Sequence, residues 1–244
     1  MEITAVTFDF WNTLVHDTAV SLTEGRRRRL TGIERIIATT GYAVPPDALE
    51  RAYDQCVAEM DSRFWRAHRD APAEDQVRVL LDCVAPELHA RLSAEQLAAV
   101  VESYVDPVLH LPPMLMPGAD IALRALATRG LTLCIISNTG RTPGRMLRRV
   151  LERYDVLQHF RVISYSDEVG YRKPSARIFA ATLEAAGARP EQTVHVGDNP
   201  IDDVWGAQQY GMRAVHYAFN GQPPAADAEL VVTELARLPD ALFS

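Results

Sequence analysis

The chain has 244 residues, of which 48% are hydrophobic, and it carries a formal net charge of −7. This length and composition suffice for a sizeable core, and the acidic balance argues against nucleic acid as a partner, because duplex-binding proteins present a basic surface. We expect no membrane association and no export, since the sequence has no apolar run long enough to span a bilayer and no leader of the exported type. The three cysteines lack any pairing or metal spacing, which indicates free thiols and a cytoplasmic location.

Short, continuous apolar runs alternate with helical patterns through most of the chain. Continuous runs are typical of strands that are buried on both faces of a parallel sheet. The alternation predicts an α/β fold with a doubly wound parallel sheet, whose functional groups gather at the carboxyl ends of the strands. The expected strands cover residues 3–8, 131–137, 161–165, 193–197, 213–217 and 229–232, and the expected helices cover residues 119–128, 143–154, 175–186 and 203–210.

The segment of residues 16–113 interrupts this alternation and carries helical patterns almost throughout. Apolar side chains recur in it at helical spacing, and the proline pairs at 45–46 and 112–113 punctuate the patterns. We therefore expect residues 16–113 to form an all-helical domain, inserted into an α/β core domain of residues 1–15 and 114–244. The two crossings between these domains are natural hinges.

Polar side chains of chemical interest follow several of the expected strands. Asp9 follows the first strand, Ser137 and Asn138 end the second, Lys173 follows the third, and Asp198 follows the fourth. Each of them alone is explained as well by a turn or a helix cap. Because the carboxyl ends of parallel strands meet at one edge of a sheet, we expect these side chains to converge on one cleft. Together they supply a nucleophile, small hydrogen-bonding groups, a cation and a metal ligand, which phosphoryl transfer requires.

Three carboxylates surround the fourth strand end, at Asp198, Asp202 and Asp203. Like charges at close range repel unless a cation or a bound proton relieves them. Hard oxygen ligands suit Mg²⁺, so the cluster predicts Mg²⁺ as the cofactor. Lys173 is the only lysine in a chain with 25 lysines and arginines, which indicates a position where a compact ammonium serves and the planar fork of arginine does not.

These four segments resemble, in order, the four motifs of the haloacid-dehalogenase-like hydrolases, and the helical insert resembles the cap domain of that family. The resemblance covers essentially the whole chain, and it rests on four motifs in register rather than on any one of them. It implies that Asp9 is the nucleophile and that Ser137 and Lys173 are further catalytic residues. It places Mg²⁺ on Asp9, on the carbonyl oxygen of Trp11 and on Asp198. The residues implied to bind the substrate phosphate are Trp11, Asn12, Thr13 and Asn138, and those implied to orient Lys173 or a metal-bound water are Asp202 and Asp203.

Trp11 departs from the pattern of the family's phosphatases, which carry an aspartate two residues after the nucleophile. That aspartate protonates the leaving group and then activates water, whereas an indole is only a hydrogen-bond donor. Loss of a positioned acid or base typically lowers the rate by roughly 10²–10⁴-fold. Phosphate esters with good leaving groups need little protonation, and His16, Asp17 and His68 are candidates to replace the missing group.

Three functions remain open. The favoured one is a Mg²⁺-dependent phosphatase that hydrolyses a small phosphorylated metabolite, a phosphate ester, through an aspartyl-phosphate on Asp9. The first alternative is a 2-haloacid dehalogenase that uses Asp9 to displace halide, because an aromatic residue at the position of Trp11 is familiar there and halide needs no protonation. Those dehalogenases use no Mg²⁺, however, and lack the carboxylate that Asp198 supplies. The second alternative is a catalytically weak module that binds metal and phosphate. The sequence makes no prediction of the oligomeric state.

Overall fold

A six-stranded parallel sheet forms the centre of the molecule. The computed structural model describes residues 2–243. The strand order is β5-β4-β1-β6-β7-β8, and all neighbouring pairs are parallel. The predicted α/β fold with a doubly wound parallel sheet is therefore confirmed. The strands are β1 (Ala5–Phe8), β4 (Thr132–Ser137), β5 (Phe160–Tyr165), β6 (Thr193–Gly197), β7 (Arg213–Tyr217) and β8 (Leu230–Val232).

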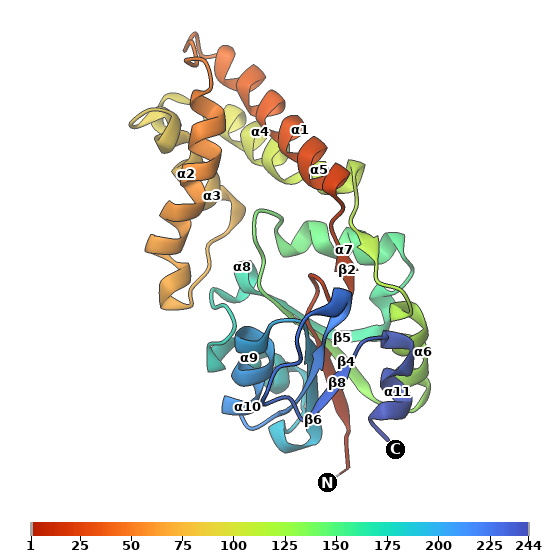
Figure 1. The fold of residues 1–244 in the computed structure, drawn as a ribbon. Helices are drawn as coiled ribbons and strands as arrows, with labels where there is room; N and C mark the ends of the chain where they lie inside the picture. Colours follow the sequence, from red (N-terminus) through yellow and green to blue (C-terminus); the bar gives the residue numbers. More distant parts are fainter. Residues whose placement is uncertain (1, 244) are drawn as a thin grey trace.

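Helices cover both faces of this sheet (Figure 1). On one face, α6 (Ala119–Thr128) and α7 (Gly144–Arg153) bury their apolar sides in the larger hydrophobic core. On the other face, α9 (Ala176–Ala186) and α10 (Gly206–Gln209) pack over the side chain of Ile136. Strands that are covered on both faces are apolar along their whole length, which explains the continuous runs in the sequence. The remaining short elements are α8 (Ser166–Val169), α11 (Leu238–Ala241), and the 3-10 turns η3 (Leu157–His159), η4 (Pro190–Gln192), η6 (Phe219–Gly221) and η7 (Leu235–Arg237).

The helix after β6 begins earlier than the sequence pattern of residues 203–210 predicts. It starts as a π-helix, η5 (Pro200–Trp205), and continues into α10. The Asn199 side chain caps it by accepting from the backbone N–H groups of Ile201 and Asp202, each at 2.9 Å. Proline at the first position favours the same start, because it needs no hydrogen-bond partner there. Asp202 consequently lies in the first turn of the helix instead of before it.

A layer of helices lies beyond the carboxyl ends of the strands (Figure 1). Their apolar faces pack on one another: α1 lies along α4, and α2 lies along α3. The helical pattern recognised in residues 16–113 is thus present, while the exact domain boundaries stay a prediction. The elements are α1 (Ala19–Ala38), α2 (Ala48–Arg63), η1 (Trp65–Ala67), α3 (Ala73–Val84), η2 (Leu88–Arg91), α4 (Ala94–Val105) and α5 (Pro107–His110).

The two connections between the helical layer and the sheet run side by side. The first contains β2 (Val15–His16) and the second contains β3 (Met114–Leu115), and these two strands form an antiparallel pair. Strands of two residues are too short to show an alternating pattern, so the sequence did not reveal them. Among residues 2–243, the structure has no helix with the length and apolar character needed to cross a bilayer.

Candidate active site

Three neighbouring strands bring predicted site residues to one edge of the sheet. Asp9 follows β1, Ser137 ends β4, and Asp198 follows β6. Because β1 lies between β4 and β6, the three side chains start from adjacent strand ends. Lys173 comes from the loop between α8 and α9 and completes the group. The expected convergence at the carboxyl ends of the strands is present in the structure.

Lys173 joins two carboxylates in the interior of this site. Its Nζ donates to Asp9 Oδ1 at 2.7 Å and to Asp203 Oδ1 at 2.5 Å, and the residue is only 3% exposed. Burial alone would lower the pKa of Lys173, but the charges of Asp203 and Asp9 outweigh it and raise that pKa above its usual value. The side chain is therefore an ammonium at neutral pH, in direct contact with Asp9.

Asp203 is held in place through both of its carboxylate oxygens. Oδ1 also contacts His195 Nε2 at 3.0 Å, and Oδ2 accepts from the backbone N–H of Asn199 at 2.9 Å. His195 Nδ1 lies 2.7 Å from Thr7 Oγ1, so both contacts are satisfied by the tautomer in which Nε2 donates and Nδ1 accepts. Burial would raise the pKa of Asp203, but Lys173 and His195 hold it well below its usual range. Thr7 and His195 are not among the predicted site residues; the signal for His195 is a histidine inside a buried strand.

Gly197 allows Asp203 to come this close to the end of β6. A Cβ atom at Gly197 would lie 2.2 Å from Cγ and 2.3 Å from Oδ2 of Asp203. These separations are far below contact distance, so any larger residue would displace the carboxylate that holds Lys173.

Asp9, Asp198 and Asp203 form an acidic cluster that fits a divalent cation. One oxygen from each carboxylate lies within 4.8 Å of the others. Since both oxygens of Asp203 already accept hydrogen bonds, Asp9 and Asp198 are the better pair of ligands. Burial, together with the charges of Asp9 and Asp203, raises the pKa of Asp198 to about 7. Burial also raises the pKa of Asp9, in spite of Lys173. A cation between Asp9 and Asp198 would stabilise both ionised carboxylates, so the donor set suits Mg²⁺.

Two buried hydroxyl groups form no hydrogen bond of good geometry within the described part of the chain. They belong to Thr13 and Ser137, and the Ser137 hydroxyl lies beside Asp9. Buried hydroxyls without partners cost free energy, and the oxygens of a bound phosphate would satisfy them. Asn12 lies beside Asp198 and has a left-handed backbone conformation, with φ at 55°.

Asn138 and Asp202 support the backbone of Lys173. The Oδ1 atom of Asn138 accepts from the Lys173 N–H at 2.7 Å, and its Nδ2 donates to the Lys173 carbonyl and to Asp202 Oδ2, each at 3.1 Å. Asp203 therefore contacts Lys173 directly, whereas Asp202 reaches it through Asn138. Because the Asn138 side chain is occupied in this way, its backbone N–H is the group that a phosphate could use.

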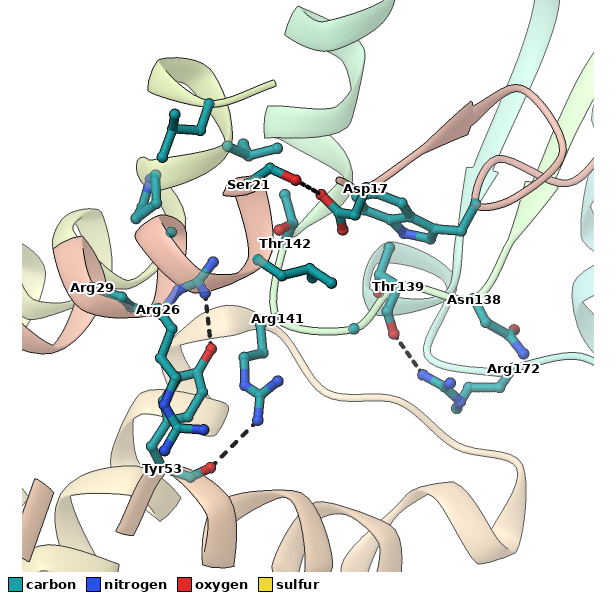
Figure 2. A pocket seen from close by; sticks show the side chains of 17 residues that line it. Asp17, Ser21, Arg26, Arg29, Tyr53, Asn138, Thr139, Arg141, Thr142 and Arg172 are labelled. Carbon is teal, nitrogen blue, oxygen red and sulfur yellow. Dashed lines mark hydrogen bonds between the residues drawn. The ribbon is translucent and has the colours of Figure 1, made fainter. Parts of the chain in front are cut away.

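A cavity of about 500 Å³ opens next to this site, between the helical layer and the strand ends. Figure 2 shows it from close by, with Asn138 and Arg172 on one side and α1 and Tyr53 across from them. Trp11 also lines it, and its ring packs edge-on against Phe10 with the centroids 5.1 Å apart. The residue at the position of the missing acid or base is thus part of the cavity wall.

The candidates for a replacement acid or base lie in three different places. Asp17 lines the same cavity as Trp11; burial raises the pKa of its carboxyl, although a hydrogen bond from Ser21 Oγ at 2.9 Å opposes the shift. His16 lines a different cavity, and His68 is exposed on the surface. Asp17 is the only one of the three that the structure places beside the site.

Asp70, which is not among the predicted site residues, connects the helical layer to the sheet. Its side chain is completely buried. Oδ2 accepts from Arg172 Nη1 at 2.8 Å and from Ser166 Oγ at 2.5 Å, with Thr139 Oγ1 at 3.3 Å, and Oδ1 accepts from Trp65 Nε1 at 3.1 Å. Arg172 directly precedes Lys173, so this contact fixes the segment that carries the site's ammonium.

Comparison with known proteins agrees with this arrangement. Residues 3–211 match the family model described as haloacid dehalogenase-like hydrolase. The human haloacid dehalogenase-like hydrolase domain-containing protein 3 is 29% identical over 177 residues, which are 71% of this chain and 68% of the relative. A phosphoserine phosphatase of Thermus thermophilus is 37% identical over 123 residues, which are 50% of this chain and about half, 48%, of the relative. The crystal structure of a 2-haloacid dehalogenase from Pseudomonas syringae superposes with a TM-score of 0.72 at 28% identity, covering 99% of this chain and 98% of that one.

The family match spans most of the chain, including every strand end described above except that of β7 and β8. It confirms the resemblance inferred from the four motifs. The chain belongs to the haloacid dehalogenase-like hydrolases.

Proposed function

We propose that the protein is a Mg²⁺-dependent phosphatase that hydrolyses a small phosphorylated metabolite. The observation that carries the proposal is the closeness of Asp9 and Asp198 at adjacent strand ends, because two such carboxylates gain from a divalent cation. Lys173 adds a second positive charge in contact with Asp9. The similarity to a phosphoserine phosphatase of Thermus thermophilus gives further support.

In this proposal Asp9 is the nucleophile. One of its oxygens attacks phosphorus, the bond to the leaving oxygen breaks, and an aspartyl-phosphate results. Water then attacks the same phosphorus, which releases inorganic phosphate and restores the carboxylate. Asp9, the carbonyl oxygen of Trp11 and Asp198 would hold Mg²⁺, which when bound would offset the negative charge of the phosphate oxygens.

The surrounding polar groups bind the phosphate and hold the ammonium. The hydroxyl of Ser137 and the Nζ of Lys173 contact non-bridging oxygens, which lowers the energy of the charged transition state. Asp203 positions the side chain of Lys173 by a direct hydrogen bond, and Asp202 positions the backbone of Lys173 through Asn138. The other groups proposed to bind phosphate are Trp11, Asn12, Thr13 and the backbone N–H of Asn138.

We propose Asp17 as the group that replaces the missing acid and base. It lines the cavity beside Trp11, and burial raises the pKa of its carboxyl, which favours the protonated form needed by a leaving alkoxide. After the leaving group departs, the same carboxylate accepts a proton from the attacking water. We further propose that residues 16–113 act as a cap domain over the core of residues 1–15 and 114–244.

A 2-haloacid dehalogenase is the second candidate. Trp11 favours it, as does the overall similarity to the 2-haloacid dehalogenase of Pseudomonas syringae. In that reaction Asp9 would attack carbon and release halide, which needs no proton. Asp198 argues against it, because a carboxylate beside the nucleophile hinders the approach of an anionic haloacid when no cation is bound.

A substrate panel distinguishes the two candidates. Phosphate esters are assayed with and without Mg²⁺ for phosphate release, and 2-chloropropionate is assayed for halide release. We expect Mg²⁺-dependent phosphate release that falls by at least about 10³-fold in Asp9→Asn, while Asp61→Asn, an exposed control, retains activity. Metal-independent halide release selects the dehalogenase, and undiminished activity of Asp9→Asn rules out Asp9 as the nucleophile in either case.

A further inference from the structure

The cavity beside the site concentrates positive charge in a chain whose net charge is −7. Four arginines line it against a single acidic residue. Such an excess attracts anions into a concave site and repels cations. The charged lining residues are Arg26, Arg29, Arg141, Arg172 and Asp17 (Figure 2).

Two of these arginines are neutralised by acidic partners. Arg26 Nη2 lies 2.5 Å from Glu50 Oε2, and its Nη1 lies 2.6 Å from Asp54 Oδ1. Arg172 is paired with Asp70 at 2.8 Å. Since their charges are compensated, these two side chains are explained by the architecture of the helical layer and of its contact with the sheet.

Arg29 and Arg141 have no such partner: within residues 2–243, no carboxylate lies at ion-pair distance from either guanidinium. Both converge on Tyr53 (Figure 2). Arg29 Nη1 donates to the Tyr53 hydroxyl at 2.9 Å, and its Nε donates to the carbonyl of Tyr104. The Arg141 guanidinium carbon lies 4.0 Å from the centroid of the Tyr53 ring. Hydrogen bonds and the aromatic ring thus hold two guanidinium groups that form no ion pair at one wall of the cavity.

A guanidinium without an ion-pair partner in a partly desolvated site is costly, and an anion that binds there reduces the cost. Arg29 is only 9% exposed, so its charge is poorly hydrated. Guanidinium groups prefer the paired oxygens of carboxylate and phosphate. The two side chains come from different parts of the chain, α1 and the loop after β4, so an anion bound between them also bridges the helical layer and the sheet.

We infer that Arg29, Arg141 and Tyr53 form a second anion-binding subsite, which takes a carboxylate or a second phosphate at the far end of the substrate from the phosphate that Asp9 attacks. Figure 2 shows Asn138, on the side of the reacting group, across the cavity from Arg29 and Tyr53. The inference rests on the proposed phosphatase function.

The rest of the cavity lining fits a short carbon chain between two anionic ends. Apolar side chains from α1, α5 and the turn after β1 form its walls, and they favour carbon over water. Asp17 is the one acidic group on the wall; burial raises the pKa of its carboxyl, and the charge of Arg29 opposes the shift. The apolar lining residues are Trp11, Leu22, Pro107, Val108 and Leu111.

The test measures binding apart from turnover. Alkylphosphonates with chains of two to four carbons, which end in a methyl group, a carboxylate or a second phosphonate, are titrated calorimetrically into the protein with Mg²⁺. We expect at least one anion-ended ligand to bind about tenfold or more tightly than its methyl-ended match. Arg141→Gln should abolish this preference, whereas Arg149→Gln, an exposed arginine on α7, should retain it. A larger gain in affinity for the carboxylate-ended ligand, relative to the methyl-ended one, indicates a carboxylate-bearing substrate. A larger gain for the ligand with a second phosphonate indicates a bisphosphate.

Arg29 also ties α1 to its neighbours, so Arg29→Gln is interpreted only together with its melting temperature, and Arg141→Gln carries the test. Equal binding of anion-ended and methyl-ended ligands by the wild-type protein overturns the inference, as does a preference that survives Arg141→Gln. The corresponding phosphate monoesters are assayed in parallel. A binding preference without phosphate release refutes the proposed function and supports the subsite, whereas phosphate release without preference refutes the subsite alone.

Discussion

Asp70 and Arg172 form a buried ion pair, with Oδ2 and Nη1 2.8 Å apart, that joins the helical layer to the segment preceding Lys173. Two backbone hydrogen bonds run beside it, from Asp70 N to the Gly170 carbonyl at 3.1 Å and from Arg172 N to the His68 carbonyl at 2.9 Å. The guanidinium also stacks over the Trp65 ring, 4.8 Å from its centroid. The position of the helical layer is therefore coupled to that of Lys173 through one pair of side chains.

Replacing Asp70 by asparagine should weaken this coupling strongly. The amide leaves Arg172 without a counter-charge in a buried place, and the cost of breaking such a pair is about 3 kcal/mol or more. We expect the free energy of unfolding from urea titration to fall by that amount. Asp61→Asn, which removes an exposed pair with Arg66, should change it little. Equal effects of the two substitutions would contradict the structural role of Asp70.

A methyl group at Gly197 should inactivate the site by displacing Asp203. In Gly197→Ala the new carbon would overlap the Asp203 carboxylate, so Asp203 must move and Lys173 loses its second anchor. We expect kcat to fall by about 10²-fold or more, with a lower melting temperature. Gly41→Ala is the control: it introduces a strained backbone, with φ at 76°, but its added carbon has nothing within 4 Å. Activity should survive there, and an active Gly197→Ala enzyme would show that Asp203 does not need its present position.

Trp11→Asp tests how completely Asp17 replaces the aspartate that the phosphatases of the family carry two residues after the nucleophile. The aspartate would stand two residues after the nucleophile and could protonate a poor leaving group, so kcat for alkyl phosphates should rise, by up to about 10²-fold. Hydrolysis of p-nitrophenyl phosphate, whose leaving group needs no proton, should change much less. Trp11→Asn removes the same indole wall without supplying a proton and serves as the control. A similar rise in both variants would mean that the indole obstructs the cavity and that proton transfer is not limiting.

Asp167 gives the stability of the protein a distinctive pH dependence. Burial raises the pKa of this carboxyl to about 6, although hydrogen bonds from the Gly144 N–H, at 3.2 Å to each oxygen, oppose the shift. The folded protein thus holds this proton more tightly than the unfolded chain does. The contribution of Asp167 to the free energy of unfolding is therefore complete below the pKa of the unfolded chain, near 4. It is lost as the pH rises through about 6.

Asp167→Asn keeps an acceptor for Gly144 and removes the charge. Relative to this variant, the wild-type protein should lose about 1–2 kcal/mol of unfolding free energy between pH 4 and pH 7, a value reduced for the partial exposure of the side chain. Urea titrations of both proteins across this range provide the measurement. A difference that is constant with pH would show that Asp167 titrates normally in the folded state.

Sequence patterns locate the sheet and the residues at its edge for a physical reason. Strands buried on both faces are apolar without interruption, so Asp9, Ser137 and Asp198 stand out as the first polar groups after them. The same reasoning misses groups whose placement depends on how distant segments pack. Asp70 lies in a loop of the insert, and its partners lie about 70 to 100 residues further on.

The cationic wall of the cavity illustrates the same limit. In the sequence, Arg29 is one of four consecutive arginines on a helix, and that run points in several directions. Only the tertiary structure separates Arg26, which finds acidic partners, from Arg29, which finds Tyr53. Arg141 reaches the same tyrosine from the loop after β4, a meeting that no local periodicity encodes.

The pairing of β2 with β3 has a consequence for how this architecture can be altered. Val15 and Leu115 are direct partners in the antiparallel pair, so the chain leaves the sheet and returns to it at neighbouring points. Antiparallel partners are separated by about 5 Å, a gap that a two-residue turn closes. The segment between them can therefore differ in length without moving the strand that presents Asp9, provided that Asp70 keeps its contact with Arg172.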